Sequence, residues 1–121
     1  MSPGKRSRPR YVPDRGEVVW LTFDPQAGHE QAGRRPAVVL SPRSYNEPSG
    51  LAILCPVTSQ IKNYPFEVLL PAALPIAGAV LADQVRSLDW RARRASLICK
   101  LPKPVTEEVL GKLRALLVEP A

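Results

Sequence analysis

The densest group of chemically capable side chains lies in residues 24–35, in the segment DPQAGHEQAGRR. His29 and Glu30 supply an acid and a base, and Arg35 supplies a permanent cation that can grip phosphate oxygens. A proline and two glycines make the segment a long polar loop, where functional groups are often displayed on a rigid scaffold. An ordinary solvated loop has the same composition, so the rest of the chain must decide between the two interpretations.

Two more groups of polar side chains follow predicted strands. The first comes directly after the apolar stretch 51–57 and consists of Thr58, Ser59, Gln60 and Lys62. An ordinary hydroxyl-containing turn would look the same. The second group lies on or after a later strand and consists of Asp83, Gln84 and Arg86. Strand alternation would place Gln84 and Arg86 on the face opposite Asp83, so one of these sets could line a groove.

The elements that must position these side chains are mostly short strands. Apolar or β-branched stretches of strand length occupy residues 16–23, 36–42, 51–57, 66–70, 79–85 and 95–101. The segment RSYNEPSG after the second stretch is typical of a turn. Because no helix is long enough for a βαβ crossover, we expect a mainly β fold, an antiparallel sheet closed into a small barrel.

One helix is predicted, from about Thr106 to Val118. Its apolar residues recur at helical spacing and are Val109, Leu110, Leu113, Leu116 and Leu117. Pro104 precedes it as a start signal, and acidic residues in the first turn precede basic ones, which suits the helix dipole.

Length and hydropathy indicate one domain. The 121 residues are too few for two self-sufficient cores, so we assign residues 1–15 to a basic, disordered tail and residues 16–121 to the domain. No apolar run approaches the ~18 residues that cross a bilayer, and no apolar segment follows the basic amino terminus as in a secretory signal. These features predict a cytoplasmic protein without a membrane partner.

The charge favours a polyanionic partner. The formal net charge is +6, from 17 Lys and Arg against 11 Asp and Glu. Residues 1–15 hold five basic residues and one acidic residue, hence +4 of the +6, and this tail could be a solubilising extension as well as a contact for a polyanionic nucleic acid. In the body, six basic residues crowd residues 86–103, with only Asp89 to offset them.

Metal and thiol chemistry are poorly supported. One histidine and two cysteines cannot build a zinc site, so we expect no metal and no cofactor, although a carboxylate-bound magnesium stays open. Cys55 and Cys99 lie in apolar stretches and are expected to be buried free thiols, with a disulfide as the alternative. Trp20 lies in a strand and is expected in the core, whereas Trp90 could stack on a base or a partner.

Several sequence blocks, in order, resemble the MazF/PemK/Kid family of toxin–antitoxin ribonucleases. They are GEVVW, GHEQAGRRPAVVLSP, PVTSQ and DQVRS, and the resemblance spans roughly residues 11–118. It implies an SH3-like barrel of the PemK/CcdB type that forms a homodimer and binds single-stranded RNA in a groove at the dimer interface. It also implies a partner, a MazE-like antitoxin with a disordered acidic tail.

The resemblance also implies roles for particular residues. The arginine of the GxRP motif and the threonine of the PVT segment, a catalytic pair in the family, are Arg35 and Thr58 here. Glu30 matches a functionally sensitive loop glutamate of MazF-like members. Kid-like members use a histidine and an aspartate, which His29 and Asp83 match, together with an arginine whose position is Leu81 here. That departure favours the MazF-like arrangement.

These residues suffice for metal-independent RNA cleavage by attack of the ribose 2′-OH, which leaves a 2′,3′-cyclic phosphate and a 5′-OH end. Arg35 would stabilise the phosphorane, Thr58 would position the phosphate, and Glu30 would be the base, with His29 as acid or alternative base. Amide side chains would read unstacked bases, and cationic side chains would hold backbone phosphates. The predicted RNA-binding residues are Gln31, Asn46, Ser59, Gln60, Lys62, Gln84 and Arg86. The alternatives are a non-catalytic CcdB-like poison and an RNA- or antitoxin-binding barrel of the same fold.

Overall fold

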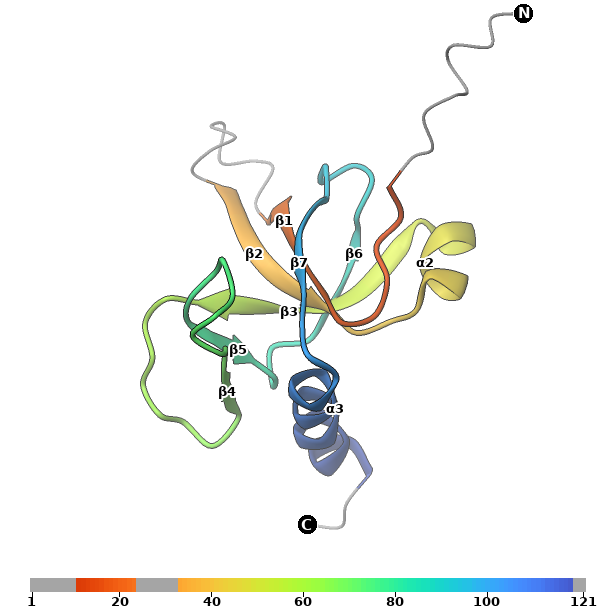
Figure 1. Ribbon diagram of the computed structural model, residues 1–121. Helices are drawn as coiled ribbons and strands as arrows, with labels where there is room; N and C mark the ends of the chain where they lie inside the picture. The colour runs from red at the N-terminus through yellow and green to blue at the C-terminus, as the bar shows by residue number, and fades with distance from the viewer. Residues whose placement is uncertain (1–10, 24–32, 119–121) are drawn as a thin grey trace, which may run out of the picture.

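A computed structural model describes residues 11–23 and 33–118, in which strands and two labelled helices follow one another along the chain (Figure 1). The strands are β1 (Glu17–Thr22), β2 (Arg34–Val39), β3 (Leu51–Thr58), β4 (Glu67–Leu69), β5 (Ala79–Leu81), β6 (Arg86–Asp89) and β7 (Ser96–Lys100). The helices are α2 (Arg43–Ser49) and α3 (Lys103–Val118). The expected mainly β fold with a carboxyl-terminal helix is confirmed.

All strand pairs are antiparallel, as expected, and the seven strands form one sheet in the order β4-β5-β3-β2-β1-β7, with β6 on β3. β3 connects the two parts of the sheet, because its first half pairs with β6 and its last two residues pair with β5. Closure into a barrel is not observed in the described part of the chain, because β4 and β7 lie at the two ends of the path and do not pair with each other. The stretch 79–85, expected as one strand, is β5 followed by a turn.

Both faces of the central strands are buried, which explains why β1, β2 and β3 are continuous apolar runs. One cluster contains Val18, Val38, Cys55 and Val57, and it is covered by Val109 of α3. The other cluster lies on the opposite face and contains Val19, Leu21, Ala37, Val39, Leu54 and Trp90. Neighbouring residues of a strand thus enter different clusters, as the pleat requires. A slip of one residue would exchange the two sets.

Helix α3 begins at Lys103, three residues before the expected start, so that Pro104 lies in its first turn, where proline is tolerated. Val109 is fully buried against the sheet, whereas Leu117 near the end of the helix is 71% exposed. The apolar face therefore covers the sheet with its first part only (Figure 1). No helix in the described ranges is long and apolar enough to span a membrane.

The segment expected as a turn after β2 is helix α2, and its Asn46 is a structural residue. The Asn46 side chain is fully buried, and its amide donates to the carbonyl oxygens of Pro13 at 2.8 Å and Ser41 at 2.9 Å. The Trp90 indole N–H donates to the Asn46 carbonyl oxygen at 2.9 Å. The prediction that Asn46 reads RNA bases is therefore wrong, because its donors are used inside the fold.

Residues 11–15, which the sequence places in the tail, pack against the domain. Val12 is 8% exposed and belongs to the second cluster. The Arg15 Nε donates to the Leu40 carbonyl oxygen at 2.7 Å. Residues 1–10 lie outside the described part of the chain.

Cys55 and Cys99 are free thiols, so the disulfide alternative is wrong. Cys55 is buried in β3, where its thiol contacts the Ala82 carbonyl oxygen at 3.7 Å. Burial raises the pKa of Cys55 to about 12, so this thiol is protonated at neutral pH. Cys99 is only partly buried, unlike the expectation.

We predict that Asn46→Ala lowers the free energy of unfolding by about 2–4 kcal/mol, because buried carbonyl groups of Pro13 and Ser41 lose their donors. Urea denaturation followed by circular dichroism measures the change. Glu47→Ala, at the neighbouring exposed position, serves as the control and should change stability by less than about 0.5 kcal/mol. Equal stabilities for the two variants would show that Asn46 does not hold α2 in place.

Candidate functional site

The register of β2 and β3 brings Arg35 and Thr58 together. Ala37 pairs with Pro56, and Val38 pairs with Cys55. Arg35 lies two residues before Ala37, and Thr58 lies two residues after Pro56, so both residues stand just beyond the last paired positions of the two strands. Residues two positions apart on a strand lie on the same face, so Arg35 shares the face of Ala37 and Thr58 shares the face of Pro56. Both residues line the same two cavities, so they form one site.

Thr58 is oriented by a local hydrogen bond. Its hydroxyl oxygen accepts the Gln60 backbone N–H at 3.0 Å, which is the turn motif expected of a hydroxyl residue followed by a loop. Since this bond uses a lone pair of the oxygen, the hydroxyl hydrogen can be donated to an acceptor in the adjoining cavities. The turn and the functional interpretations of Thr58 are therefore compatible.

Arg35 and its neighbour Arg34 differ in what they contact. The Arg34 guanidinium makes hydrogen bonds within the protein, including one to the Arg94 carbonyl oxygen at 2.9 Å. Arg35 is exposed, and no group of the described residues makes a hydrogen bond or ion pair with its guanidinium. Its donors are thus available to an anion that enters the site.

Three cavities surround Thr58, and we call their lining residues together the Thr58 surface. Their volumes are about 210, 460 and 500 Å³. Thr58 lines all three, Arg35 lines the two larger ones, and Gln84 lines the smallest and the largest. The other predicted site residues on this surface are Ser59, Gln60, Lys62, Asp83 and Arg86. The polar groups after β3 and after β5 therefore meet in space.

The loop after β3 is held against β4. The Glu67 carboxylate accepts the backbone N–H groups of Lys62 at 3.1 Å and Asn63 at 2.9 Å. These bonds help hold the part of the loop that lines the smallest cavity with Lys62 and Tyr64. Because residues 82–85 form a turn and loop, strand alternation does not separate Asp83 from Gln84, and both line that cavity.

Aromatic side chains missed as site residues belong to the Thr58 surface. Trp20, expected in the core, is 38% exposed and lines a cavity with Arg35, whereas Trp90 is 3% exposed in the core. Phe23 lies 5.4 Å under the Arg86 guanidinium, and both line the largest cavity. Tyr64 is exposed and lines the smallest cavity. Of these aromatic residues, only Tyr64 could have been predicted as a site residue from the sequence, because it lies in a polar loop.

His29, Glu30 and Gln31 lie outside the described residues. The described residues that flank this segment lie close to Arg35, because the Phe23 N–H donates to the Gly33 carbonyl oxygen at 2.8 Å. Among the described residues, no group of three or more His, Cys, Asp or Glu side chains is arranged to hold a metal ion.

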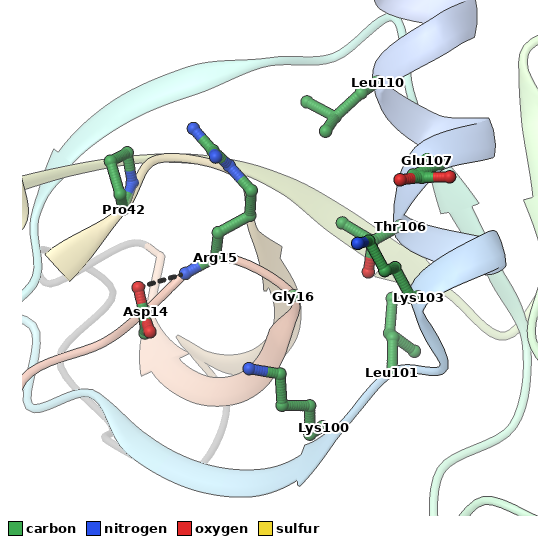
Figure 2. A pocket seen from close by; sticks show the side chains of 10 residues that line it. All are labelled: Asp14, Arg15, Gly16, Pro42, Lys100, Leu101, Lys103, Thr106, Glu107 and Leu110. Atoms are coloured by element: carbon green, nitrogen blue, oxygen red, sulfur yellow. Dashed lines mark hydrogen bonds between the residues drawn. The ribbon is translucent and has the colours of Figure 1, made fainter.

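A separate cavity of about 610 Å³ lies at the other end of β1, between the strand and the start of α3 (Figure 2). Its walls include Gly16, Lys100 and Thr106. Arg35 pairs with Leu21, so the strand rise of about 3.3 Å per residue puts Gly16 roughly 16 Å away along β1. Two carboxylates, Asp14 and Glu107, line this cavity together with cationic side chains. This cavity is larger than those around Thr58, but it contains none of the predicted site residues.

The sequence model of the PemK-like, MazF-like toxins of type II toxin–antitoxin systems matches residues 14–117. The chain belongs to this family. It is 55% identical over 87 residues to the endoribonuclease toxin MazF of Escherichia coli strain K12, covering 72% of this chain and 78% of the relative. It is 35% identical over 108 residues to the endoribonuclease PemK of Escherichia coli, covering 86% and 81%.

Solved structures agree with this assignment. The chain superposes on MazF of Deinococcus radiodurans with a TM-score of 0.81 at 62% identity, covering 89% of this chain and 98% of that chain. A MazE–MazF structure from the same organism gives a TM-score of 0.82 at 54% identity, covering 92% and 100%. The sequence-based assignment to this family is thereby confirmed.

We predict that Gly78→Ala lowers the free energy of unfolding by about 2–4 kcal/mol, because an added Cβ would lie 2.1 Å from the Thr58 carbonyl oxygen at a residue with φ of +132°. Gly111→Ala is the matched control. Nothing lies within 4 Å of its added Cβ, so this change in the interior of a helix should raise stability by about 0.5–1 kcal/mol. Urea denaturation distinguishes the two, and an unperturbed Gly78→Ala variant would contradict the close approach to Thr58.

Proposed function

We propose that the protein is the toxin of a type II toxin–antitoxin system, an endoribonuclease that cuts single-stranded RNA at the Thr58 surface without a metal and thereby stops translation and growth. The observation that carries the proposal is that Arg35, an exposed arginine without a hydrogen-bond or ion-pair partner among the described residues, lines the same two cavities as the Thr58 hydroxyl. Relatives that share most of the chain, MazF and PemK, are endoribonucleases.

Arg35 is suited to the charge that develops during cleavage. When the ribose 2′-OH attacks the phosphorus, negative charge grows on the non-bridging oxygens of the phosphorane. A planar guanidinium can hold two of these oxygens at once, and it stays cationic in proteins and so does not serve as a base. Arg35 therefore acts electrostatically, and the proton transfers belong to other groups.

Thr58 orients the phosphate. With its oxygen already accepting the Gln60 N–H, the hydroxyl hydrogen is donated to a phosphate oxygen beside Arg35. Two donors from neighbouring strands then fix the phosphate relative to the attacking 2′-OH, which lowers the entropic part of the barrier. Because the nucleophile is the 2′-OH, DNA is bound but not cut.

Proton transfer requires a base for the 2′-OH and an acid for the leaving 5′ oxygen. We assign the base to Glu30 and the acid to His29, with His29 as the alternative base. Asp83 lines a cavity with Thr58 and is a further candidate for either proton transfer. The products are a 2′,3′-cyclic phosphate and a 5′-OH end.

Base selectivity arises beside the scissile phosphate. The smallest cavity combines the amides of Gln60 and Gln84 with the rings of Tyr64 and Phe66, so an unstacked base can be stacked and read on its edge there. Ser59 and Gln31 add further polar contacts. Lys62 and Arg86 hold flanking phosphates.

The proposed partners follow from the same surface. An antitoxin of the MazE type, with an acidic disordered tail, competes with RNA for the cations of the Thr58 surface, and MazE–MazF complexes are among the solved relatives. The toxin acts as a homodimer in the cytoplasm, where its RNA substrate is present.

Incubating the purified protein with a long messenger RNA in EDTA tests the activity. We expect cleavage at a small set of related sequences, with 2′,3′-cyclic phosphate and 5′-OH ends identified by end mapping. An all-DNA version of the same sequence should be bound and left intact. Loss of cleavage on chelation, with recovery on adding magnesium, would contradict the metal-free mechanism.

Arg35→Gln should lower kcat by about 10²- to 10³-fold, the usual effect of removing a donor that stabilises transition-state charge. Thr58→Val, which removes the hydroxyl and keeps the shape, should lower it by about 10- to 100-fold. Arg114→Gln, an exposed charge change on α3, is the control and should cleave at the normal rate. Normal rates for Arg35→Gln would remove this residue from the site.

A further inference from the structure

The Arg34 guanidinium makes hydrogen bonds within the protein. Nη2 donates to the carbonyl oxygens of Arg94 at 2.9 Å and Trp20 at 3.4 Å and to the Ser96 hydroxyl at 3.3 Å. Nη1 contacts the Thr22 hydroxyl at 3.2 Å and the Arg93 carbonyl oxygen at 3.4 Å. A residue of β2 thereby grips the end of β1 and the loop before β7.

Arg93 makes the reciprocal contacts. Its Nη1 donates to the carbonyl oxygens of Thr22 at 3.0 Å and Phe23 at 2.6 Å. In the backbone, the Thr22 N–H donates to the Arg93 carbonyl oxygen at 3.0 Å. Arg34 holds the carbonyl side of the loop that carries Arg93, and Arg93 holds the last two described residues before position 24. The two side chains together link the end of β1, the start of β2 and the loop before β7.

We propose that Arg34 and Arg93 are positioning residues, a clamp that joins the ends of β1 and β2 and thereby fixes the neighbouring Arg35 relative to Thr58. The inference rests on the proposed nuclease function for its catalytic part. Beside the clamp, the Phe23 N–H donates to the Gly33 carbonyl oxygen at 2.8 Å, and Arg93 donates to the carbonyl oxygens of both Thr22 and Phe23.

The placement of the clamp explains why it acts through Arg35. Arg34 and Arg35 are consecutive in β2, so their side chains leave on opposite faces. With Arg34 anchored at five points, the backbone of β2 at this end has little freedom to rotate, and Arg35 keeps its direction toward the Thr58 surface. Functional groups held within about 0.5 Å of the productive geometry depend on such supporting contacts.

Two simpler roles make different predictions. If Arg34 only stabilised the fold, its loss would reduce the folded fraction, with kcat and KM per folded molecule unchanged. If Arg34 only contacted RNA phosphates, lysine would replace it, KM would rise, and the salt dependence of binding would weaken. The clamp requires the planar fork of arginine, which lysine lacks.

The test measures cleavage kinetics of Arg34→Lys, Arg34→Gln, Arg35→Gln and the double variant Arg34→Gln/Arg35→Gln, with Arg114→Gln as the charge control. We expect both Arg34 variants to lose about 10- to 100-fold in kcat with KM changed less than about threefold. In the Arg35→Gln background, removal of Arg34 should cost less than about threefold, because a residue that acts through Arg35 has no further effect once Arg35 is absent. Additive losses, or a fully active Arg34→Lys, would overturn the proposal.

Hydrogen–deuterium exchange provides a readout that does not depend on RNA. In Arg34→Gln and in Arg93→Gln, the amides of Thr22 and Phe23 should exchange about 10- to 100-fold faster, while those of α3 stay unchanged. Unchanged exchange at these two amides would refute the clamp even if RNA is cut. Faster exchange in a protein that cuts no RNA would leave the clamp in place and reject the nuclease function instead.

Discussion

The antiparallel register between β2 and β3 is the constraint on which the site depends. It aligns Ala37 with Pro56, and just beyond this last pair Arg35 and Thr58 line the same two cavities. A shift of one residue would send the arginine to the opposite face, because successive side chains of a strand alternate. The cation and the hydroxyl would then line different surfaces, and no single phosphate could reach both.

Burial on both faces enforces this register. Val38 and Cys55 enter the cluster under α3, while Val39 and Leu54 enter the cluster that contains Trp90. Any slip would place residues of the wrong size in both cores, so the apolar packing selects a single alignment. This packing fixes the positions of the site residues at the strand ends. The hydrogen bonds of Arg34 further hold the end of β1 in place.

The sequence was sufficient for most of the fold and for the key pair. Continuous apolar runs with proline and glycine between them predicted the strands, and ordered sequence blocks singled out Arg35 and Thr58. Asn46 was misassigned because a short polar segment with a proline looks like a turn, and only tertiary contacts with Pro13 and Trp90 explain the helix. Trp20, expected in the core, is on the surface, and Trp90, considered as a stacking residue, is in the core. A position in a strand does not by itself show which face of that strand is covered. A closed barrel was predicted and is not observed among the described residues, because apolar patterns locate strands but do not show which strands pair.

A structure of the protein with an RNA that carries a 2′-deoxyribose at a mapped cleavage position tests the central claim most directly, since the substrate is held but cannot react. The account predicts that the phosphate after that nucleotide lies within hydrogen-bond distance of both the Arg35 guanidinium and the Thr58 hydroxyl. A scissile phosphate bound elsewhere, for instance beside Gly16 and Lys100 in the cavity at the start of α3, would contradict it.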